Sequence, residues 1–441
     1  MVLFFKDKNE LIYAVDSPEV LDSKNISKLE WLFTGTYLND TKIILEKFLG
    51  PRKTMITPWS TNAVEITQNM AIEKLLRIEV YRPMKSFSKK FDPMLFEEYE
   101  NLNQDIFKSF IKPNPLMDIN DIKGFNEKEG LALSPEEVKY LEDLSGKIKR
   151  KLTDSEVFGF SQVNSEHCRH KIFNGKFIID DIEKKDSLFK LIKKTSKLNP
   201  NEIVSAYKDN VAFVEGPIVE QFAPLVADHP SYFKKSTFES VISLKAETHN
   251  FPTTVEPFNG AATGAGGEIR DRLAGGKGSL PLAGTAVYMT SYPRIDSKRE
   301  WVKNERDWLY QTPLDILIKA SNGASDFGNK FGQPLISGSV FTFEHSDDNL
   351  SLGYDKVIML AGGIGFGKKN QSLKDIPCEN DTIVILGGDN YRIGMGGAAV
   401  SSTDTGKYSS GIELNAVQRS NPEMQKRVAN AIRGFIEAKN N

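Results

Sequence analysis

The sequence predicts a multidomain chain in which a small α+β unit precedes a larger α/β body. Short apolar runs and helical patterns mix over residues 1–140, whereas β-rich runs alternate with glycine-dense turns from about residue 185. The chain has 441 residues, of which 39% are hydrophobic and 26% charged. A soluble chain of this size and composition has room for about two to four domains.

The N-terminal region contains two patterns of apolar residues, one typical of strands and one typical of helices. Residues 1–5 and 11–15 are short β-rich runs, and we expect strands there. Residues 22–32 and 39–49 carry apolar side chains at helical spacing, which predicts two helices. Together they indicate an α+β unit.

Two further helices are predicted from their start signals. Ser134-Pro135 followed by Glu136 and Glu137 combines an N-cap, proline at the first helical position and acids in the first turn. A second helix is expected to begin near Thr153 and to run toward residue 164. The lysine-rich residues 184–197 suggest the solvated face of another helix.

The body of the chain is predicted to contain strands separated by glycine-rich turns. The β-rich runs are residues 211–214, 241–244, 284–290, 356–360 and 382–386. Glycine clusters at residues 362–367 and 394–397 are interpreted as tight turns between strands.

Charge and cysteine content exclude several classes of protein. The chain has 57 Lys and Arg against 59 Asp and Glu, a net charge of -2, which argues against a nucleic-acid partner. Cys168 and Cys378 form no disulfide framework, and this fits a reducing cytosol. The sequence contains no signal-peptide pattern and no apolar run of membrane-spanning length, so we expect a cytoplasmic protein without a membrane partner.

The densest glycine segment, GAATGAGGEIRD at residues 260–271, is a candidate phosphate-binding loop. Small residues let backbone amides approach a phosphate, and a helix beginning after them would favour an anion. Arg270 could bind phosphate oxygens at two points, and Asp271 could hold Mg²⁺. A flexible glycine loop without a ligand is the alternative. The segment is neither a Walker A loop nor a dinucleotide-binding fingerprint.

The string SEHCRHK at residues 165–171 concentrates polar and ionisable groups that are costly to bury unless they bind something. A zinc site lacks a second ligand cluster. A Cys168 nucleophile with an adjacent histidine base is conceivable. Acid–base work or phosphate binding by His167 or His170 is more plausible, and a network capping a helix end is the remaining alternative.

The string KAETHNFP at residues 245–252 follows an apolar strand, where α/β active sites gather. Strand alternation would place Lys245, Glu247 and His249 on one face. A carboxylate there suits a metal, a lysine suits a nucleotide phosphate and a histidine suits proton transfer. A surface loop is the alternative.

These strings, in this order, resemble phosphoribosylformylglycinamidine synthases of the large single-chain type. Residues 162–171, 246–252 and 260–271 are similar to three signatures of that family, although Val163 stands where alanine is expected. Shorter similarities occur at residues 51–60, 329–332 and 411–419, so the resemblance covers about residues 45–430.

The resemblance implies an ATP-dependent carbon–nitrogen ligase of purine biosynthesis. Such an enzyme converts formylglycinamide ribonucleotide, ATP and glutamine-derived ammonia to formylglycinamidine ribonucleotide, with ATP and Mg²⁺ as cofactors. The γ-phosphate of ATP would activate the substrate amide oxygen, and ammonia would then displace phosphate.

The resemblance also assigns roles to residues. His167 and His249 would be catalytic, with His249 as proton acceptor, and Glu247 and Asp271 would bind Mg²⁺. Substrate would contact Thr248, Asn250, Phe251 and Arg270. The nucleotide would contact His170, Lys245, Gly260, Ala261, Ala262, Thr263, Gly264, Ala265, Gly266, Gly267, Glu268, Ile269, Arg270 and Asp271.

By the same resemblance the chain divides into four parts. Residues 1–140 would be a small-subunit-like α+β domain and 141–185 a helical linker. Residues 186–350 would be an ATP-binding domain of the aminoimidazole-ribotide-synthetase type, and 351–441 an incomplete start of its C-terminal partner domain. The second synthetase half and the glutaminase domain of the large enzymes would be missing partners.

Other functions remain open at this stage. The chain could be a half-synthetase that binds nucleotide without catalysis on its own, and it could self-associate through the surface meant for the second half. A sibling synthetase, for aminoimidazole ribotide or selenophosphate, is a further alternative. The SEHCRHK string and the N-terminal domain argue against it.

Overall fold

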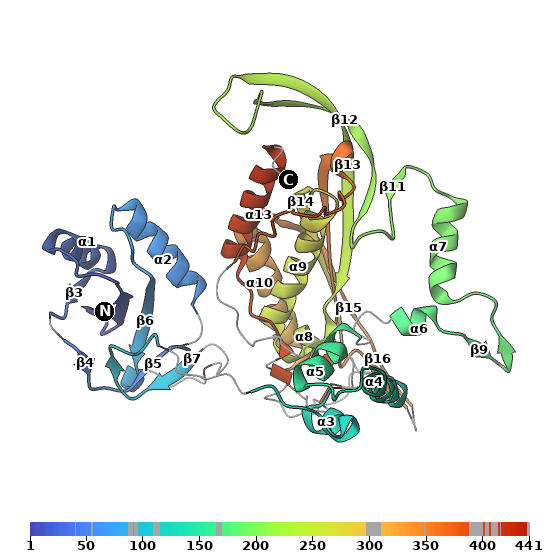
Figure 1. Ribbon diagram of the computed structural model, residues 1–441, viewed down its shortest axis with the longest axis horizontal. Coiled ribbons are helices and arrows are strands. Elements are labelled where there is room, and N and C mark those ends of the chain that lie inside the picture. The colour runs from blue at the N-terminus through green and yellow to red at the C-terminus, as the bar shows by residue number, and fades with distance from the viewer. Residues whose placement is uncertain are drawn as a thin grey trace. The chain divides into compact units, whose positions relative to one another are not determined.

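The computed structural model (Figure 1) describes residues 1–39, 41–53, 56–86, 91, 96–108, 115–131, 133–164, 170–296, 310–347, 350–387, 400–401, 405–406, 413–414 and 416–438. These residues form two compact units. The first consists of residues 1–115 together with residues 386–387, and the second of the other described residues. The four-part division made from the sequence stays a prediction.

The first unit is an antiparallel sheet with a hydrophobic core on each face. Its strand order is β3-β1-β2-β6-β5-β7. One core lies under the helices and includes Phe5, Leu29 and Ile78, and the other includes Phe4 and Tyr81. The elements are β1 Val2–Asp7, β2 Ile12–Asp16, α1 Ser23–Phe33, β3 Gly35–Tyr37, β4 Ile43–Ile44, β5 Phe48–Pro51, α2 Pro58–Asn69, β6 Arg77–Pro83, the 3-10 helix Met84–Ser86, β7 Phe96–Tyr99 and β8 Leu102–Asn103.

The strands expected at residues 1–15 and the helix at 22–32 are confirmed, but the helix expected at 39–49 is wrong. That stretch contains β4 and β5. Phe48 and Leu49 are both buried, because β5 lies between β6 and β7. Sheet pairing has overridden a helical spacing of apolar residues.

Three helices open the second unit. They are α3 Ile122–Glu129, α4 Pro135–Ile148 and α5 Asp154–Val163, packed around a small core that includes Leu141 and Val157. The start signals predicted from the sequence are confirmed. Ser134 and Thr153 cap their helices, each in a reciprocal capping box.

The main sheet of the second unit has six strands in the order β11-β12-β13-β18-β14-β15. Helices α9 and α10 cover one of its faces (Figure 1), around a core that includes Ala261, Ile269 and Phe327. The elements are α6 His170–Asn174, β9 Ile178–Ile179, β10 Ile182–Glu183, α7 Leu188–Leu198, β11 Ile203–Ser205, β12 Ala212–Pro224, β13 Phe233–Thr248, α8 Asn250–Val255, α9 Pro257–Ala274, β14 Leu280–Thr290, α10 Pro313–Phe331, β15 Leu335–Thr342, β16 Glu344–Ser346, β17 Ser351–Gly353, β18 Ile358–Lys368, the 3-10 helix Lys369–Gln371 and α13 Pro422–Glu437.

Three expectations for the second unit are wrong. The GAATGAGGEIRD segment is the middle of α9 and not a loop. The glycines at 362–367 belong to β18 and not to turns, and residues 382–386 form no strand. The glycines at 394–397 lie outside the described residues. The lysine-rich segment does form a helix, α7, and none of its residues is buried.

Candidate nucleotide and metal site

The small residues of α9 serve close packing between elements. A Cβ at Gly260 would lie 2.4 Å from the backbone of Pro252 in α8, and one at Gly264 would lie 2.9 Å from Cβ of His249. Side chains 261, 262 and 265 lie in the hydrophobic core. The segment therefore brings α8 and the end of β13 directly against α9, which places the polar groups of both strings in one region.

Lys245, Glu247 and Asp271 form the Lys245 cluster. The Lys245 ammonium lies 3.3 Å from Glu247 Oε2 and 2.8 Å from Asp271 Oδ2. The strand and the helix thus bring together three groups predicted from two separate strings. Burial lowers the pKa of Lys245, but Asp271 and Glu247 outweigh it, so the net shift is upward. The carboxylates remain accessible, with 32% and 25% of their side chains exposed.

Two carboxylates converging on one cation fit the donor set of Mg²⁺. This ion is usually held by one or two carboxylates, with phosphate oxygens and water completing its shell. Within the described parts of the chain, no group of three His, Cys, Asp or Glu side chains gathers as a metal site. Glu247 and Asp271 are the carboxylates of this region that could hold such an ion, with phosphate oxygens and water as its further ligands.

Arg270 lies beside this cluster on α9. Burial lowers the pKa of its guanidinium, and the charges of Asp271 and Glu247 oppose that shift. Its Nη1 donates a hydrogen bond of 3.0 Å to Gln425 Oε1, which comes from α13. Gln425 was not predicted from the sequence. It lies 155 residues further along the chain, and no local pattern marks it.

His249 lies at the N-terminal end of α8, and its ring is fixed by the chain around it. Nδ1 donates a hydrogen bond to the carbonyl oxygen of Gly260, so in the neutral ring Nε2 is the nitrogen with a lone pair. Its backbone N–H donates to Met359 in β18. This orientation is compatible with proton acceptance by Nε2.

The predicted substrate-binding residues lie close to His249 in the chain, whereas His170 lies on another helix. The backbone N–H of Thr248 donates to Glu247, Asn250 Oδ1 accepts from the backbone of Met359, and Phe251 is buried. His170 begins α6, where its ring contacts Phe189 of α7. His167 lies outside the described residues.

Glu268 is turned away from the Lys245 cluster. Its carboxylate accepts from Arg272 Nε at 2.8 Å and from the Gln333 amide, and both Glu268 and Arg272 are 1% exposed. Burial raises the pKa of Glu268, while Arg272 acts in the opposite direction. Gly363 and Gly365 of β18 leave room for this pair, because a Cβ at either position would lie within 2.8 Å of it.

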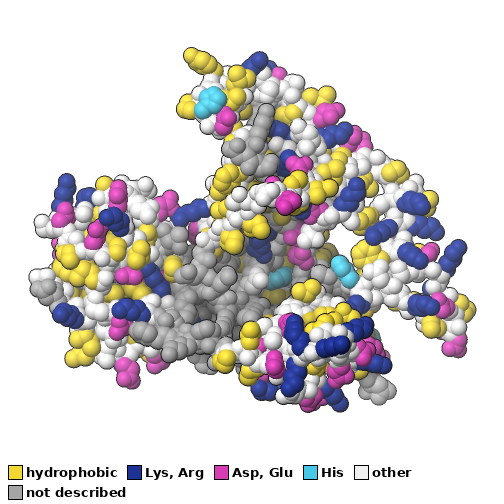
Figure 2. Space-filling view, in the orientation of Figure 1, with side chains coloured by type: hydrophobic (Ala, Val, Ile, Leu, Met, Phe, Trp, Pro, Cys, Tyr) yellow, Lys and Arg dark blue, Asp and Glu magenta, His cyan; other side chains and the backbone are white. Residues whose placement is uncertain are grey.

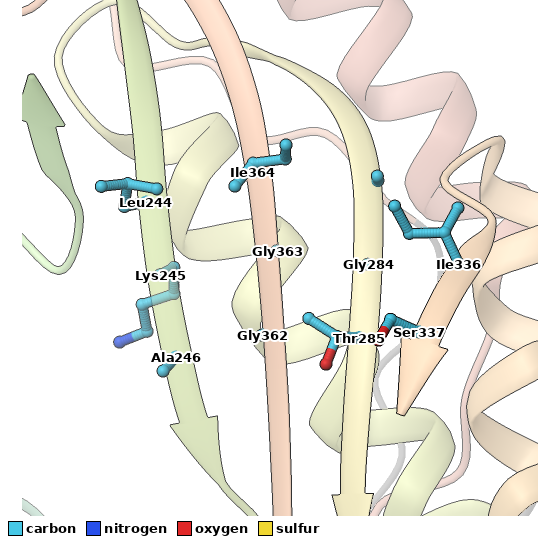
Figure 3. A pocket seen from close by; sticks show the side chains of 11 residues that line it. Leu244, Lys245, Ala246, Gly284, Thr285, Ile336, Ser337, Gly362, Gly363 and Ile364 are labelled. Atoms are coloured by element: carbon cyan, nitrogen blue, oxygen red, sulfur yellow. The ribbon is translucent and has the colours of Figure 1, made fainter. Parts of the chain in front are cut away.

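The opposite face of the sheet carries an open hollow (Figure 3). It has a volume of about 450 Å³ and spans β13, β18, β14 and β15. Leu244 and Ile364, which are paired across two strands, and Ile336 lie on its rim, each at least 38% exposed. Gly284, Gly362 and Gly363 form part of its floor. Leu244, Ile336 and Ile364 make this hollow apolar, and the core beneath α9 and α10 lies on the other face of the sheet.

Comparison with protein families identifies the first part of the chain. Residues 10–105 match the family model of the formylglycinamide ribonucleotide amidotransferase N-terminal domain, and residues 122–171 match that of its linker domain. Both models describe domains of one amidotransferase. For these two segments the matches confirm the resemblance to phosphoribosylformylglycinamidine synthases that the motifs indicated.

Solved structures with similarity to the chain include three from Thermotoga maritima. T. maritima PurL complexed with FGAR is 22% identical over 68% of this chain, with a TM-score of 0.39. T. maritima PurL complexed with ATP is 21% identical over 68% of this chain, with a TM-score of 0.39. Phosphoribosylformylglycinamidine synthase II from T. maritima is 20% identical over 68% of this chain, with a TM-score of 0.35. The chain spans 38%, 36% and 36% of their respective lengths.

Proposed function

We propose that this chain is the N-terminal part of a phosphoribosylformylglycinamidine synthase and binds Mg²⁺-ATP at the Lys245 cluster. The observation that carries the proposal is the convergence of Glu247 and Asp271 on Lys245, at the point where two family-like motifs meet. The matching N-terminal and linker domains support the family.

In this proposal the residues of the site bind phosphate oxygens, hold Mg²⁺ or accept a proton. Lys245 donates hydrogen bonds to phosphate oxygens, and Arg270 contributes a second cation nearby. Glu247 and Asp271 hold Mg²⁺, which when bound neutralises phosphate charge. The amide oxygen of formylglycinamide ribonucleotide attacks the γ-phosphorus of ATP, and the bond to ADP breaks. Glutamine-derived ammonia then attacks the activated carbon, His249 Nε2 accepts a proton that the nitrogen loses, and the carbon–oxygen bond breaks to release phosphate.

Calorimetric titration of the chain with Mg²⁺-ATP tests this site. We expect saturable binding that Glu247→Ala and Asp271→Ala each weaken by more than about tenfold, the scale found when a metal site loses a supporting group. Glu220→Ala is the matched control, because Glu220 pairs with Lys235 away from the cluster, on the β12–β13 hairpin. Equal affinity in all four proteins would contradict the proposed site.

The apolar sheet face supports a second part of the proposal, which concerns partners. We propose that the second synthetase half of the enzyme covers the hollow around Leu244 and Ile364, and that the chain alone lacks full synthase activity. Apolar side chains also gather over the outer part of the β12–β13 hairpin (Figure 2), including Phe222 and Tyr232. In isolation the chain is expected to associate with itself through such surfaces.

Sedimentation velocity over a wide concentration range tests the partner surface. We expect the mass to rise with concentration, and Ile364→Lys to shift the chain to monomer, because it places a charge in the hollow. Ile376→Lys is the control, since this side chain is 87% exposed and does not line the hollow. A strict monomer at high concentration would count against self-association.

Within the described parts of the chain, no helix combines the length and apolar character that a membrane crossing requires.

A further inference from the structure

The Arg270 guanidinium is a mostly buried cation whose direct partner is neutral. Among the described residues its hydrogen bond goes to the Gln425 amide, while the carboxylates of Glu247 and Asp271 act on it through their charge. Buried charges in proteins are normally paired. A guanidinium held by a neutral acceptor keeps its positive charge available for an anion.

Two glycines define where this guanidinium lies. A Cβ at Gly266 would lie 2.7 Å from Arg270 Nη1, so the guanidinium occupies the space that a side chain there would fill. A Cβ at Gly267 would lie 3.7 Å from Arg270 Nη2 and 3.8 Å from Glu247 Cγ. Nη1 thus binds Gln425, while Nη2 and the side chain of Glu247 both border the space beside Gly267.

The position of Gln425 depends on how α13 packs against α10 (Figure 1). Lys426 lies over the ring of Phe331, with its Nζ 5.0 Å from the ring centroid. Glu423 lies 3.7 Å from Lys330, which also pairs with Asp326 of α10. The helix that supplies Gln425 is therefore anchored on α10, independently of Arg270.

We propose that Gln425 is a positioning residue, which holds Nη1 of Arg270 so that Nη2 faces a phosphate group bound at the Lys245 cluster. This inference rests on the proposed function and adds to it a dependence of phosphate binding on the docking of α13. A neutral amide fits the role because it orients the guanidinium without cancelling its charge. A carboxylate at 425 would compete with the phosphate.

Two variants separate orientation from charge. Gln425→Leu keeps the size of the side chain but removes the hydrogen bond, and we expect Mg²⁺-ATP to bind about tenfold more weakly, the scale of a lost hydrogen bond to a charged group. Gln425→Glu keeps an acceptor and adds a charge that pairs with Arg270. It should leave the fold intact yet weaken binding at least as much. Asn430→Ala is the control, because it changes an exposed residue of α13 and leaves the contacts of Lys426 and Glu423 with α10 in place.

A second readout follows Arg270 without any nucleotide. The rate at which phenylglyoxal modifies Arg270, measured by peptide mass spectrometry on the folded chain, should rise in Gln425→Leu and not in Asn430→Ala. Titration with formylglycinamide ribonucleotide in place of Mg²⁺-ATP shows which phosphate depends on Gln425.

The outcomes are distinct. Unchanged affinity and an unchanged modification rate in Gln425→Leu overturn the inference. A parent chain that binds neither phosphate ligand contradicts the proposed function, and the modification rate then decides whether Gln425 holds Arg270.

Discussion

Helix α9 carries two pairs of charged residues that differ in their burial and in their partners. Glu268 and Arg272 lie one helical turn apart, face the glycines of β18 and pair with each other and with Gln333. Arg270 and Asp271 lie between them in sequence but point to other elements, because each residue turns the helix by about 100°. Arg270 donates a hydrogen bond to the neutral Gln425, and Asp271 forms an ion pair with Lys245, where both side chains are partly exposed.

This difference distinguishes a structural pair from a candidate ligand site. The Glu268–Arg272 pair is closed to solvent, and glycines have cleared the space for it, so no ligand is needed to balance its charges. The Lys245 cluster is reachable, and beside it lies a cation without a carboxylate in direct contact among the described residues. A bound anion would neutralise the charge of Arg270, and a divalent metal bound with it would neutralise the charges of the two carboxylates.

The largest effect is expected from breaking the buried pair. Arg272→Ala leaves the Glu268 carboxylate buried and unpaired, which should cost about 3–5 kcal/mol of unfolding free energy. Hydrogen exchange of the β18 amides measures this loss, and it reports on the second unit separately from the first.

Arg270→Ala is the matched variant on the same helix. It removes no direct ion pair, so its loss of stability should be much smaller, while Mg²⁺-ATP binding should fall. Equal destabilisation by the two variants would mean that the contrast between the two sides of α9 is mistaken.

The sequence predicted much of this site because its signals are local. Lys245 and Glu247 follow from strand alternation at the end of β13, and the caps of α4 and α5 follow from their first-turn residues. In the structure Glu247 and Asp271 both form ion pairs with Lys245. The catalytic and ligand roles stay predictions.

What the sequence could not predict depends on partners far along the chain. Glycines in a row indicate a loop, yet in α9 and β18 they leave space for neighbouring elements and for two arginines. The helix expected at residues 39–49 was overridden by sheet pairing. Gln425 has no local signal at all, because its role exists only once α13 packs beside α9.

A smaller effect is expected where a glycine makes room for Arg270. In Gly266→Ala the new Cβ would lie 2.6 Å from Phe327 Cζ and 2.7 Å from Arg270 Nη1, so both side chains must shift. Overpacking of this kind typically costs about 1–3 kcal/mol. Urea unfolding should show the loss of stability, and titration should show weaker Mg²⁺-ATP binding because the guanidinium is displaced.

The neighbouring glycine gives the control with the smallest effect and the opposite sign. A Cβ at Gly267 meets Arg270 and Glu247 only at 3.7 and 3.8 Å, which is ordinary van der Waals contact. Since alanine in a helix is favoured over glycine by about 0.5–1 kcal/mol, Gly267→Ala should unfold at slightly higher urea concentration than the parent. If it were instead as damaging as Gly266→Ala, space for the guanidinium could not explain the glycine pair, and a direct approach of the α9 backbone to a ligand would become the better explanation.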